Sequence, residues 1–174
     1  MSKVQLYIST YFPYADRVEK EYGIPALFLL AQSAFESGYG NAKPGNMMFG
    51  VKAGKTWTGR KQLLTTTEYT TNLDVAKKSY PQILEVTKVS DTKWKLKVKD
   101  WFRAYDTPYD SFVDHAKLIT KSDRYKGWER YKNDIPGMAY HLASKGYATL
   151  DPIQYRNRVA SIATEIKIEL EKKK

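Results

Sequence analysis

The residue whose surroundings most favour chemistry is a glutamate at the end of an apolar segment. Between Pro25 and Glu36 only Gln32 and Ser33 are polar. Pro25 suits the first turn of a helix, and Gly38 suits a left-handed cap that would end it. A helix that is apolar on all sides is buried in a protein. The sequence therefore predicts a buried helix that carries one carboxyl group at its C-terminal end.

This position favours the protonated form of Glu36. The negative end of the helix macrodipole disfavours a charged carboxylate, and apolar neighbours such as Phe35 disfavour it further by desolvation. A carboxylic acid that keeps its proton near neutral pH can protonate the leaving oxygen when a glycosidic bond breaks. The local residues also fit a solvated glutamate at a frayed helix end. Glu36 is a candidate acid catalyst, with an ordinary surface residue as the alternative.

Other combinations that could support chemistry are incomplete. His115 and His141 are the only histidines, and neither has neighbours at metal-ligand spacing, so we expect structural or surface roles. Asp114 precedes His115, but adjacent helical residues point in different directions, which argues against a triad. Gly38-Tyr39-Gly40 lacks the third glycine and the preceding strand of a phosphate loop. The chain has no cysteine, which excludes thiol catalysis and disulfides. We expect no metal and no cofactor.

The periodicity of apolar residues predicts a helical body with a small antiparallel insert between about residues 60 and 105. Helical spacing occurs over residues 4–22, 111–121 and 136–144, and from 152 to about 170. Period-two spacing predicts strands over 61–69, 83–89 and 94–105, with a turn at 90–92. Within the first helix Pro13 predicts a kink or a fresh start, and Gly23 predicts its end. Asp151 is the expected N-cap of the last helix.

The composition fits one globular domain with a basic surface. The chain has 174 residues, of which 42% are hydrophobic and 14% aromatic, enough for a single core. A net charge of +10 predicts attraction to a polyanion such as nucleic acid, acidic lipid or an anionic cell wall. The basic residues are mostly lysine and scattered, without Arg-rich clusters, so we expect no nucleic-acid partner. The alternative is a lysine-rich surface without a specific partner.

Neither a membrane span nor a signal peptide is visible. No run of about 18 apolar residues occurs, so we expect no segment that crosses a membrane. The first residues, Met-Ser-Lys-Val-Gln, lack the charged-then-apolar pattern of a signal peptide. An exported protein of this sequence would use another route or would have lost its leader.

Several short motifs occur in the order of a known enzyme family. The segment AQSAFESGYG, residues 31–40, resembles the AQ-x-x-x-ESGWG motif of bacterial and phage glucosaminidases, glycoside hydrolase family 73. Later segments resemble further motifs of that family: residues 46–53 N-x-FG-x-KA with one extra residue, 57–59 W-x-G, 65–69 TTTEY, 102–105 FR-x-Y, 124–125 RY and 146–149 GYATD. Each match is weak alone, but the ordered set spans residues 24 to about 160 and is specific.

The sequence departs from the family pattern in three places. Tyr39 replaces the usual Trp and keeps an aromatic ring. The stretch from Thr71 to Lys99 is longer than the usual hairpin, which predicts an enlarged β lobe. Leu150 separates the GYAT segment from Asp151 and so alters the motif at that turn.

The resemblance implies a mainly helical, lysozyme-like α+β fold with two lobes, one of them a small antiparallel β lobe. It implies a single catalytic domain over residues 1–174, with a helical lobe at about 1–55 and 106–174 and a β lobe at about 56–105. The implied reaction is hydrolysis of the β-1,4 bond between N-acetylglucosamine and N-acetylmuramic acid in peptidoglycan. Such an enzyme acts in the periplasm, the cell wall or the extracellular space, on glycan strands at an anionic wall surface. We expect a monomer.

The family motifs also imply site residues. The glutamate of ESGWG is the general acid and matches Glu36. The glutamate of the β-lobe strand is a proposed second carboxylate and matches Glu68. The aromatic and amide residues of the other motifs line the sugar groove and match Asn46, Phe49, Trp57, Tyr125 and Tyr147.

The sequence leaves the mechanism and the type of cut open. Two carboxyl groups about 5 Å apart imply retention of configuration, and about 6.5–9.5 Å implies inversion. Glu68 could be a base, a charge stabiliser or an ordinary strand residue, since the acetamido group of the substrate could assist instead. The alternatives to a glucosaminidase are a muramidase or lytic transglycosylase of the same fold, a non-catalytic wall-binding module, and a nucleic-acid binder.

Overall fold

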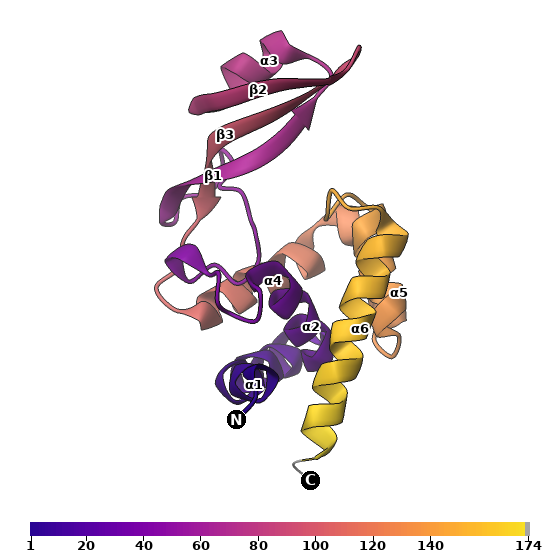
Figure 1. Ribbon diagram of the computed structural model, residues 1–174. Coiled ribbons are helices and arrows are strands. Elements are labelled where there is room, and N and C mark those ends of the chain that lie inside the picture. Colours follow the sequence, from indigo (N-terminus) through magenta and orange to yellow (C-terminus); the bar gives the residue numbers. More distant parts are fainter. Residues whose placement is uncertain (173–174) are drawn as a thin grey trace. The chain divides into compact units, whose positions relative to one another are not determined.

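The computed structural model describes residues 1–172 (Figure 1). The chain forms two compact units, and each is described by itself. Met1–Phe49 and the chain from Asp106 onward form a helical unit, and Gly50–Tyr105 form a sheet unit. The mainly helical α+β fold with a small antiparallel sheet that the sequence predicts is confirmed.

The helical unit is built around one buried helix. Its α-helices are α1 (Lys3–Tyr22), α2 (Ala26–Ser37), α4 (Pro108–Lys121), α5 (Ile135–Ser144) and α6 (Pro152–Glu171), with short 3-10 turns at Pro44–Asn46, Asp123–Tyr125 and Trp128–Tyr131. Nine of the twelve residues of α2 are buried, and α2 lies between α1 and α6 (Figure 1). The absence of charge before its last turn lets α2 form the centre of the core.

The helix ends match the signals in the sequence with one exception. Gly23 and Gly38 adopt the left-handed conformation, with φ of 76° and 58°, and their N–H groups bond to carbonyls of α1 and α2. The Asp151 side chain accepts hydrogen bonds from the first N–H groups of α6, as expected of an N-cap. The expected restart at Pro13 is wrong, because α1 continues through Pro13 to Tyr22.

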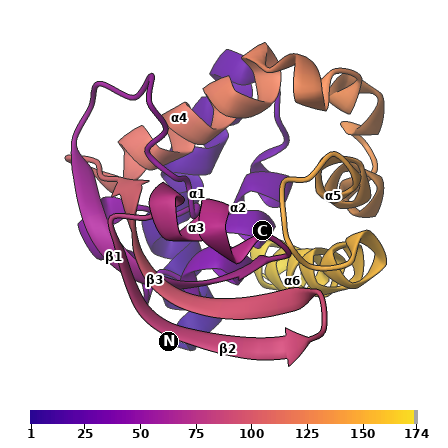
Figure 2. The same ribbon diagram turned by 90° about the horizontal axis from the view of Figure 1, so that it is seen from above.

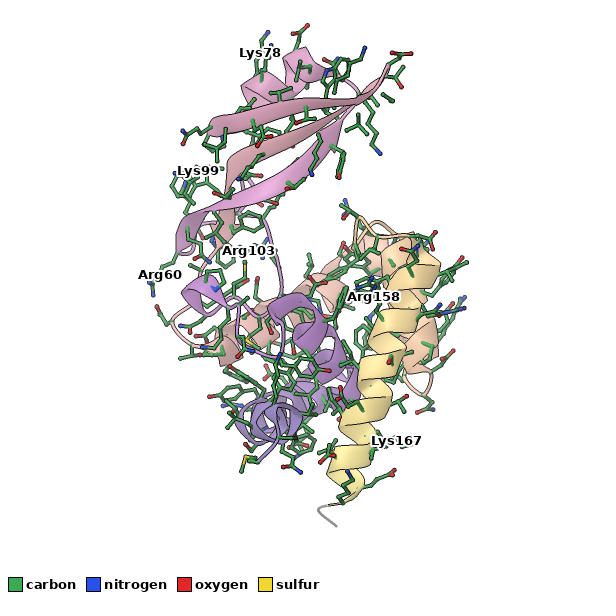
Figure 3. The ribbon with its side chains drawn as sticks, viewed as in Figure 1. Arg60, Lys78, Lys99, Arg103, Arg158 and Lys167 are labelled. Carbon is green, nitrogen blue, oxygen red and sulfur yellow. The ribbon has the colours of Figure 1, made fainter. Side chains whose placement is uncertain are left out.

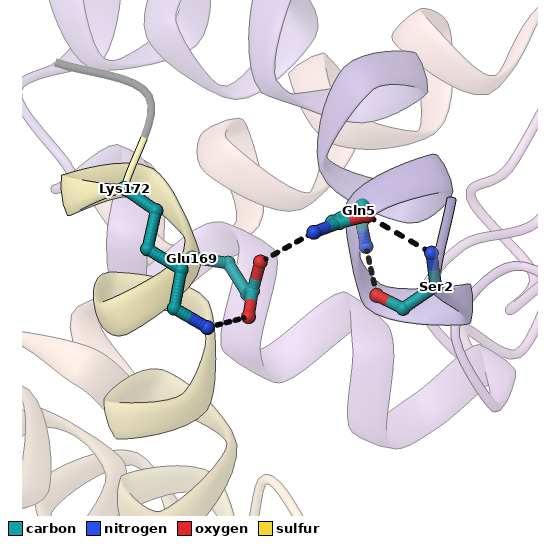
Figure 4. A network of polar contacts seen from close by, with 4 residues as sticks. All are labelled: Ser2, Gln5, Glu169 and Lys172. Carbon is teal, nitrogen blue, oxygen red and sulfur yellow. Dashed lines mark hydrogen bonds and ion pairs between the residues drawn. The ribbon is translucent and has the colours of Figure 1, made fainter.

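A polar network joins the start of α1 to the end of α6 (Figure 4). Ser2 and Gln5 form a reciprocal capping box, in which each side chain accepts a hydrogen bond from the other's backbone N–H. The Gln5 side chain also donates to Glu169 at 2.9 Å, and Lys172 pairs with Glu169 at 2.6 Å. The cap of the first helix therefore also fixes the last turns of α6.

The sheet unit has three antiparallel strands in the order β1-β3-β2. The strands are β1 (Lys61–Thr70), β2 (Gln82–Ser90) and β3 (Lys93–Arg103), and the short helix α3 (Leu73–Ser79) connects β1 to β2. Helix α3 covers one face of the sheet, where Ala76 packs with Leu96 and Val98 (Figure 2). The long 71–99 stretch contains α3, β2 and the first part of β3, and the periodicity did not predict α3.

Backbone hydrogen bonds close the base of the sheet unit. Before β1 begins, the Val51 carbonyl accepts from Arg103 N–H at 2.9 Å, and Ala53 N–H donates to the Trp101 carbonyl at 2.8 Å. Lys52 and Phe102 form an isolated antiparallel bridge between these bonds. The unit therefore begins at Gly50, earlier than the strand pattern alone indicates. Among residues 1–172, no helix has the length and apolar character needed to span a membrane.

Candidate active site

Glu36 lies in the last turn of α2, where the chain is fixed on both sides. The buried Ser37 hydroxyl donates to the Ser33 carbonyl at 2.6 Å and accepts from Gly40 N–H at 2.8 Å. Gly38 ends the helix two residues after Glu36. The glycines and serine of the ESGYG segment therefore form a turn that holds Glu36 at the edge of the core.

The protein around Glu36 favours its neutral form. Its side chain is open to solvent, yet the surrounding protein raises the pKa of its carboxyl group by desolvation. The Tyr155 hydroxyl donates a hydrogen bond to Oε1 at 3.3 Å, which acts in the opposite direction and is the weaker effect. Glu36 thus keeps its proton to a higher pH than an ordinary glutamate, as the sequence predicts for an acid catalyst.

Buried side chains from three helices connect to Glu36 through Tyr155. Gln32 on α2, fully buried, donates from Nε2 to the Tyr155 hydroxyl of α6 at 2.9 Å. The Gln32 carbonyl oxygen lies 2.6 Å from Nε2 of His115 on α4. Gln32 is one helical turn before Glu36, so both side chains lie on the same face of α2. The sequence analysis did not identify Gln32 or Tyr155.

The directions of these hydrogen bonds follow from the donors and acceptors available. Burial lowers the pKa of His115 to about 3, so its ring is neutral. The amide oxygen of Gln32 can only accept, which places the ring proton on Nε2 of His115. Nδ1 is then an unprotonated nitrogen, and it is buried without a partner in residues 1–172. The opposite arrangement would bury an unpaired N–H donor, which is rarer in proteins than an unpaired acceptor. His115 is therefore a structural residue, as expected.

Because His115 is buried in its neutral form, we expect the folded protein to be less stable at acid pH. Its pKa is about 6.5 in an unfolded chain and about 3 in the folded protein. Between these values the unfolded state binds more protons, so stability rises with pH and is lost as the pH falls. We expect the free energy of unfolding, measured in urea, to fall from pH 6.5 toward pH 3. In His115→Phe the part of this fall that is due to His115 should be missing. An identical pH dependence in both proteins would contradict the neutral, buried state of His115.

The predicted aromatic residues of the helical unit form one cluster with the network. Phe49 stacks on His115 with ring centroids 3.7 Å apart, and Tyr147 contacts His115, Tyr125 and Tyr155. Phe49 is fully buried and Tyr125 is 3% exposed. Both rings are largely covered by packing within the helical unit, and their contact with a sugar stays a prediction. Tyr147 is only half-buried and remains a candidate for sugar contact.

Asn46 holds two distant parts of the helical unit together. It adopts a left-handed conformation with φ of 56°, which asparagine tolerates better than most residues. Its side-chain amide donates to the Asp106 carbonyl at 2.9 Å. These two residues flank the sheet unit in the chain, so the bond fixes the segments that lead into and out of that unit.

In the sheet unit, Glu68 is held by a lysine. Lys52 contacts Glu68 at 2.7 Å and Asp100 at 3.0 Å, and the Glu68 side chain is 19% exposed. Burial alone would lower the pKa of Lys52, but the two carboxylates raise it, so its ammonium group stays charged. Lys52 belongs to the N-x-FG-x-KA segment, which could have indicated a role, but neither Lys52 nor Asp100 was among the predicted site residues.

Trp57 is fixed within the same unit. Its indole N–H donates to the Arg60 carbonyl at 2.9 Å, and the Arg103 guanidinium lies 4.3 Å from the ring centroid. A Cβ atom at Gly59 would lie 2.5 Å from the ring. The W-x-G spacing therefore has a steric cause, because only glycine leaves room for the indole.

The predicted site residues thus belong to two units. Glu36, Asn46, Phe49, Tyr125 and Tyr147 lie in the helical unit, and Trp57 and Glu68 lie in the sheet unit. Among residues 1–172, no group of three or more His, Asp or Glu side chains has an arrangement suited to a metal ion. The chemistry available is that of one carboxyl group with a raised pKa, Glu36, and one carboxyl group that contacts a lysine, Glu68.

Comparison with known families decides the assignment. The glucosaminidase family, described as mannosyl-glycoprotein endo-beta-N-acetylglucosaminidase, matches residues 12–168. The chain belongs to the glucosaminidase family. This membership confirms the resemblance that the ordered motifs indicate, and it places the chain among glycoside hydrolases.

Relatives of this glucosaminidase-family chain include proteins named peptidoglycan hydrolase FlgJ. The protein from Salmonella typhimurium is 32% identical over 157 residues, and that from Vibrio cholerae is 28% identical over 160 residues. These alignments cover 86% and 88% of this chain. The chain spans about two fifths of the length of these relatives, 42% and 41% respectively.

Solved structures show the same fold. A peptidoglycan hydrolase from Sphingomonas sp. A1 has a TM-score of 0.71 at 26% identity, covering 96% of this chain and 93% of that one. The glycoside hydrolase domain of Salmonella typhimurium FlgJ has a TM-score of 0.67 at 27% identity, covering 99% and 92%. The predicted lysozyme-like fold is therefore confirmed.

Proposed function

We propose that this chain hydrolyses the glycan strand of peptidoglycan at the β-1,4 bond between N-acetylglucosamine and N-acetylmuramic acid. The observation that carries the proposal is Glu36, a carboxyl group with a raised pKa at the end of the central helix of a glucosaminidase-family fold. The names of the relatives, peptidoglycan hydrolases, support the same substrate. The chain would act where peptidoglycan lies, in the periplasm, the cell wall or outside the cell.

Glu36 would act as the general acid. Tyr155 donates to Oε1, so the proton of the neutral carboxyl group would reside on Oε2 and face the substrate. When the glycosidic bond breaks, this proton passes to the bridging oxygen and Glu36 becomes a carboxylate. The Tyr155 hydrogen bond then stabilises the new negative charge, since a donor favours the ionised form. Tyr155 would therefore contribute more after proton transfer than before it.

Glu68 would be the second carboxylate, acting as a base for water or as a stabiliser of positive charge on the sugar. Lys52 and Asp100 hold its position, and the charged Lys52 keeps a positive group beside it. Assistance by the substrate's own acetamido group is the alternative, in which Glu68 has a smaller role. Trp57 and Tyr147 are the aromatic residues proposed to contact sugars.

Two measurements on purified peptidoglycan test the proposal. Clearing of a turbid suspension would show cleavage, and mass spectrometry of the fragments would show which sugar carries the new reducing end. N-acetylglucosamine at the reducing end is the expected result. A reducing N-acetylmuramic acid would instead identify a muramidase, and absence of clearing would favour a non-catalytic binding module.

Replacement of Glu68 tests whether the reaction needs a second carboxylate in addition to Glu36. We expect Glu68→Gln to lower the rate by about 10²–10⁴-fold, the usual contribution of a positioned acid or base. Glu85→Gln, which removes an exposed carboxylate from β2, a strand separated from β1 by β3, should leave the rate unchanged. Full activity of Glu68→Gln, with fragments lighter by one water, would identify a lytic transglycosylase, which needs no residue to activate water.

A further inference from the structure

The positive charge of the protein is concentrated in the sheet unit. Residues Gly50–Tyr105 contain twelve Lys and Arg against five Asp and Glu, a net charge of +7, while the whole chain carries +10. Less than a third of the chain thus holds most of the excess charge. In sequence these lysines look scattered, but the strand register brings many of them onto one surface.

The central strand carries this surface. Lys93, Lys95, Lys97 and Lys99 alternate with Trp94, Leu96 and Val98 along β3. The apolar residues of the alternation pack on the α3 side, so the lysines project from the opposite face. Side chains two residues apart on a strand are about 6.6–6.8 Å apart. The four ammonium groups therefore form a row with a regular spacing. Figure 3 shows Lys99 on this strand, and Lys78 on α3.

Threonine residues flank the row of lysines, and few acidic residues lie beside it. Thr65 and Thr67 of β1 pair with Lys99 and Lys97, and Thr87 of β2 pairs with Lys95. A shallow hollow of about 310 Å³ lies among Thr67, Glu85, Thr87, Lys95 and Lys97. We call the row and these flanking residues the lysine face. No ion pair joins its lysines to an acid within residues 1–172, and Glu85 is its single carboxylate.

We propose that the lysine face binds a linear polyol-phosphate polymer of the cell envelope. The regular spacing of the ammonium groups suits phosphate diesters repeated along a flexible chain, and threonine hydroxyls can donate to the same oxygens. This inference rests on the proposed function, which places the chain at the wall. Binding there would retain the enzyme beside its substrate without using the catalytic residues.

The aromatic residues of this face argue against nucleic acid. Proteins that bind single strands present open aromatic rings on which bases stack. Here Lys61 lies 4.5 Å from the Trp101 ring centroid, and Lys93 lies 4.9 Å from that of Tyr69. An ammonium group thus lies over one face of each ring, and the row contains lysine without arginine. The face therefore fits a polymer of phosphates without bases.

Binding of poly(glycerol phosphate) to the full chain tests this proposal. This polymer has no glycosidic bond, so its binding is measured independently of hydrolysis, and failure of either proposal can be recognised separately. We expect the double variant Lys95→Gln/Lys97→Gln to bind about tenfold more weakly or worse and to show a shallower dependence on salt. Both side chains are exposed, so the fold should be retained.

Lys77→Gln/Lys78→Gln is the matched control. It removes the same charge from exposed positions on α3, in the same unit but away from the lysine face, and should change binding by less than about twofold. Equal weakening by both double variants would show attraction to total charge and overturn the proposal. Tighter binding of a thymidine oligonucleotide or of phosphatidylglycerol vesicles than of poly(glycerol phosphate) would overturn the choice of partner.

Discussion

Glu36→Gln should lower the rate of peptidoglycan cleavage by at least about 10²–10⁴-fold, because an amide cannot supply the proton that the bridging oxygen needs. The substitution preserves the size of the side chain and its contact with the Tyr155 hydroxyl. The residue is exposed at the end of α2, so folding should not suffer. Clearing of purified peptidoglycan, with circular dichroism to confirm the fold, provides the measurement.

A matched variant makes this test specific. Glu171→Gln makes the same change at an exposed position at the end of α6, and its activity should equal that of the unmodified chain. Retention of more than about a tenth of the activity by Glu36→Gln would be incompatible with a general acid at this position.

Tyr155→Phe should move the alkaline limb of the pH–rate profile to higher pH. Glu36 is active while protonated, so activity is lost as pH rises through its pKa. The Tyr155 hydrogen bond lowers that pKa, and its removal therefore extends activity to higher pH. The variant also leaves the buried Gln32 amide without an acceptor, which should reduce the free energy of unfolding by about 1–3 kcal/mol. Titration of the Glu36 carboxyl carbon by NMR measures the pKa without reference to catalysis.

A double-mutant cycle tests how His115 contributes. His115→Phe keeps a ring to stack on Phe49 but removes the donor that fixes the Gln32 amide. If His115 acts through Gln32 and Tyr155, the His115→Phe substitution should raise the Glu36 pKa when Tyr155 is present. It should have no further effect on that pKa in Tyr155→Phe. Gln32→Met interrupts the same chain of hydrogen bonds and replaces His115→Phe in the cycle if that variant does not fold. Equal shifts of the Glu36 pKa with and without Tyr155 would exclude an effect of His115 through Tyr155.

Much of the fold could be predicted because its signals are local. The apolar run before Glu36, the glycines at 23 and 38, and Asp151 each specify a helix or its end through neighbouring residues alone. Helix α3 was missed because a seven-residue helix offers only two turns of periodicity. The helix does not restart at Pro13, because tertiary packing of α1, which buries Tyr11 and Ala15 on either side, outweighs the local cost of a proline.

The candidate site was predictable only in part, for a related reason. Glu36 follows from its own segment, and Glu68 from the family motif. Tyr155 and His115 contact the site from helices more than 80 residues away in the chain, and no local pattern identifies such partners. Phe49 was assigned to the groove because it belongs to the N-x-FG motif. Only tertiary packing determines that its ring stacks on His115 and is buried.

The backbone hydrogen bonds between residues 51–53 and 101–103 affect how freely the sequence of the sheet unit can vary. Because the incoming and outgoing segments pair with each other at the base of the sheet unit, whatever lies beyond them can change in length without stretching the polypeptide on either side. Recombinant exchange of residues 71–92 for a shorter or differently charged segment, which keeps Glu68 and Asp100 in place, should therefore be tolerated. In this arrangement, the length and charge of the sheet unit can change while Glu36 and the helices that hold it stay the same.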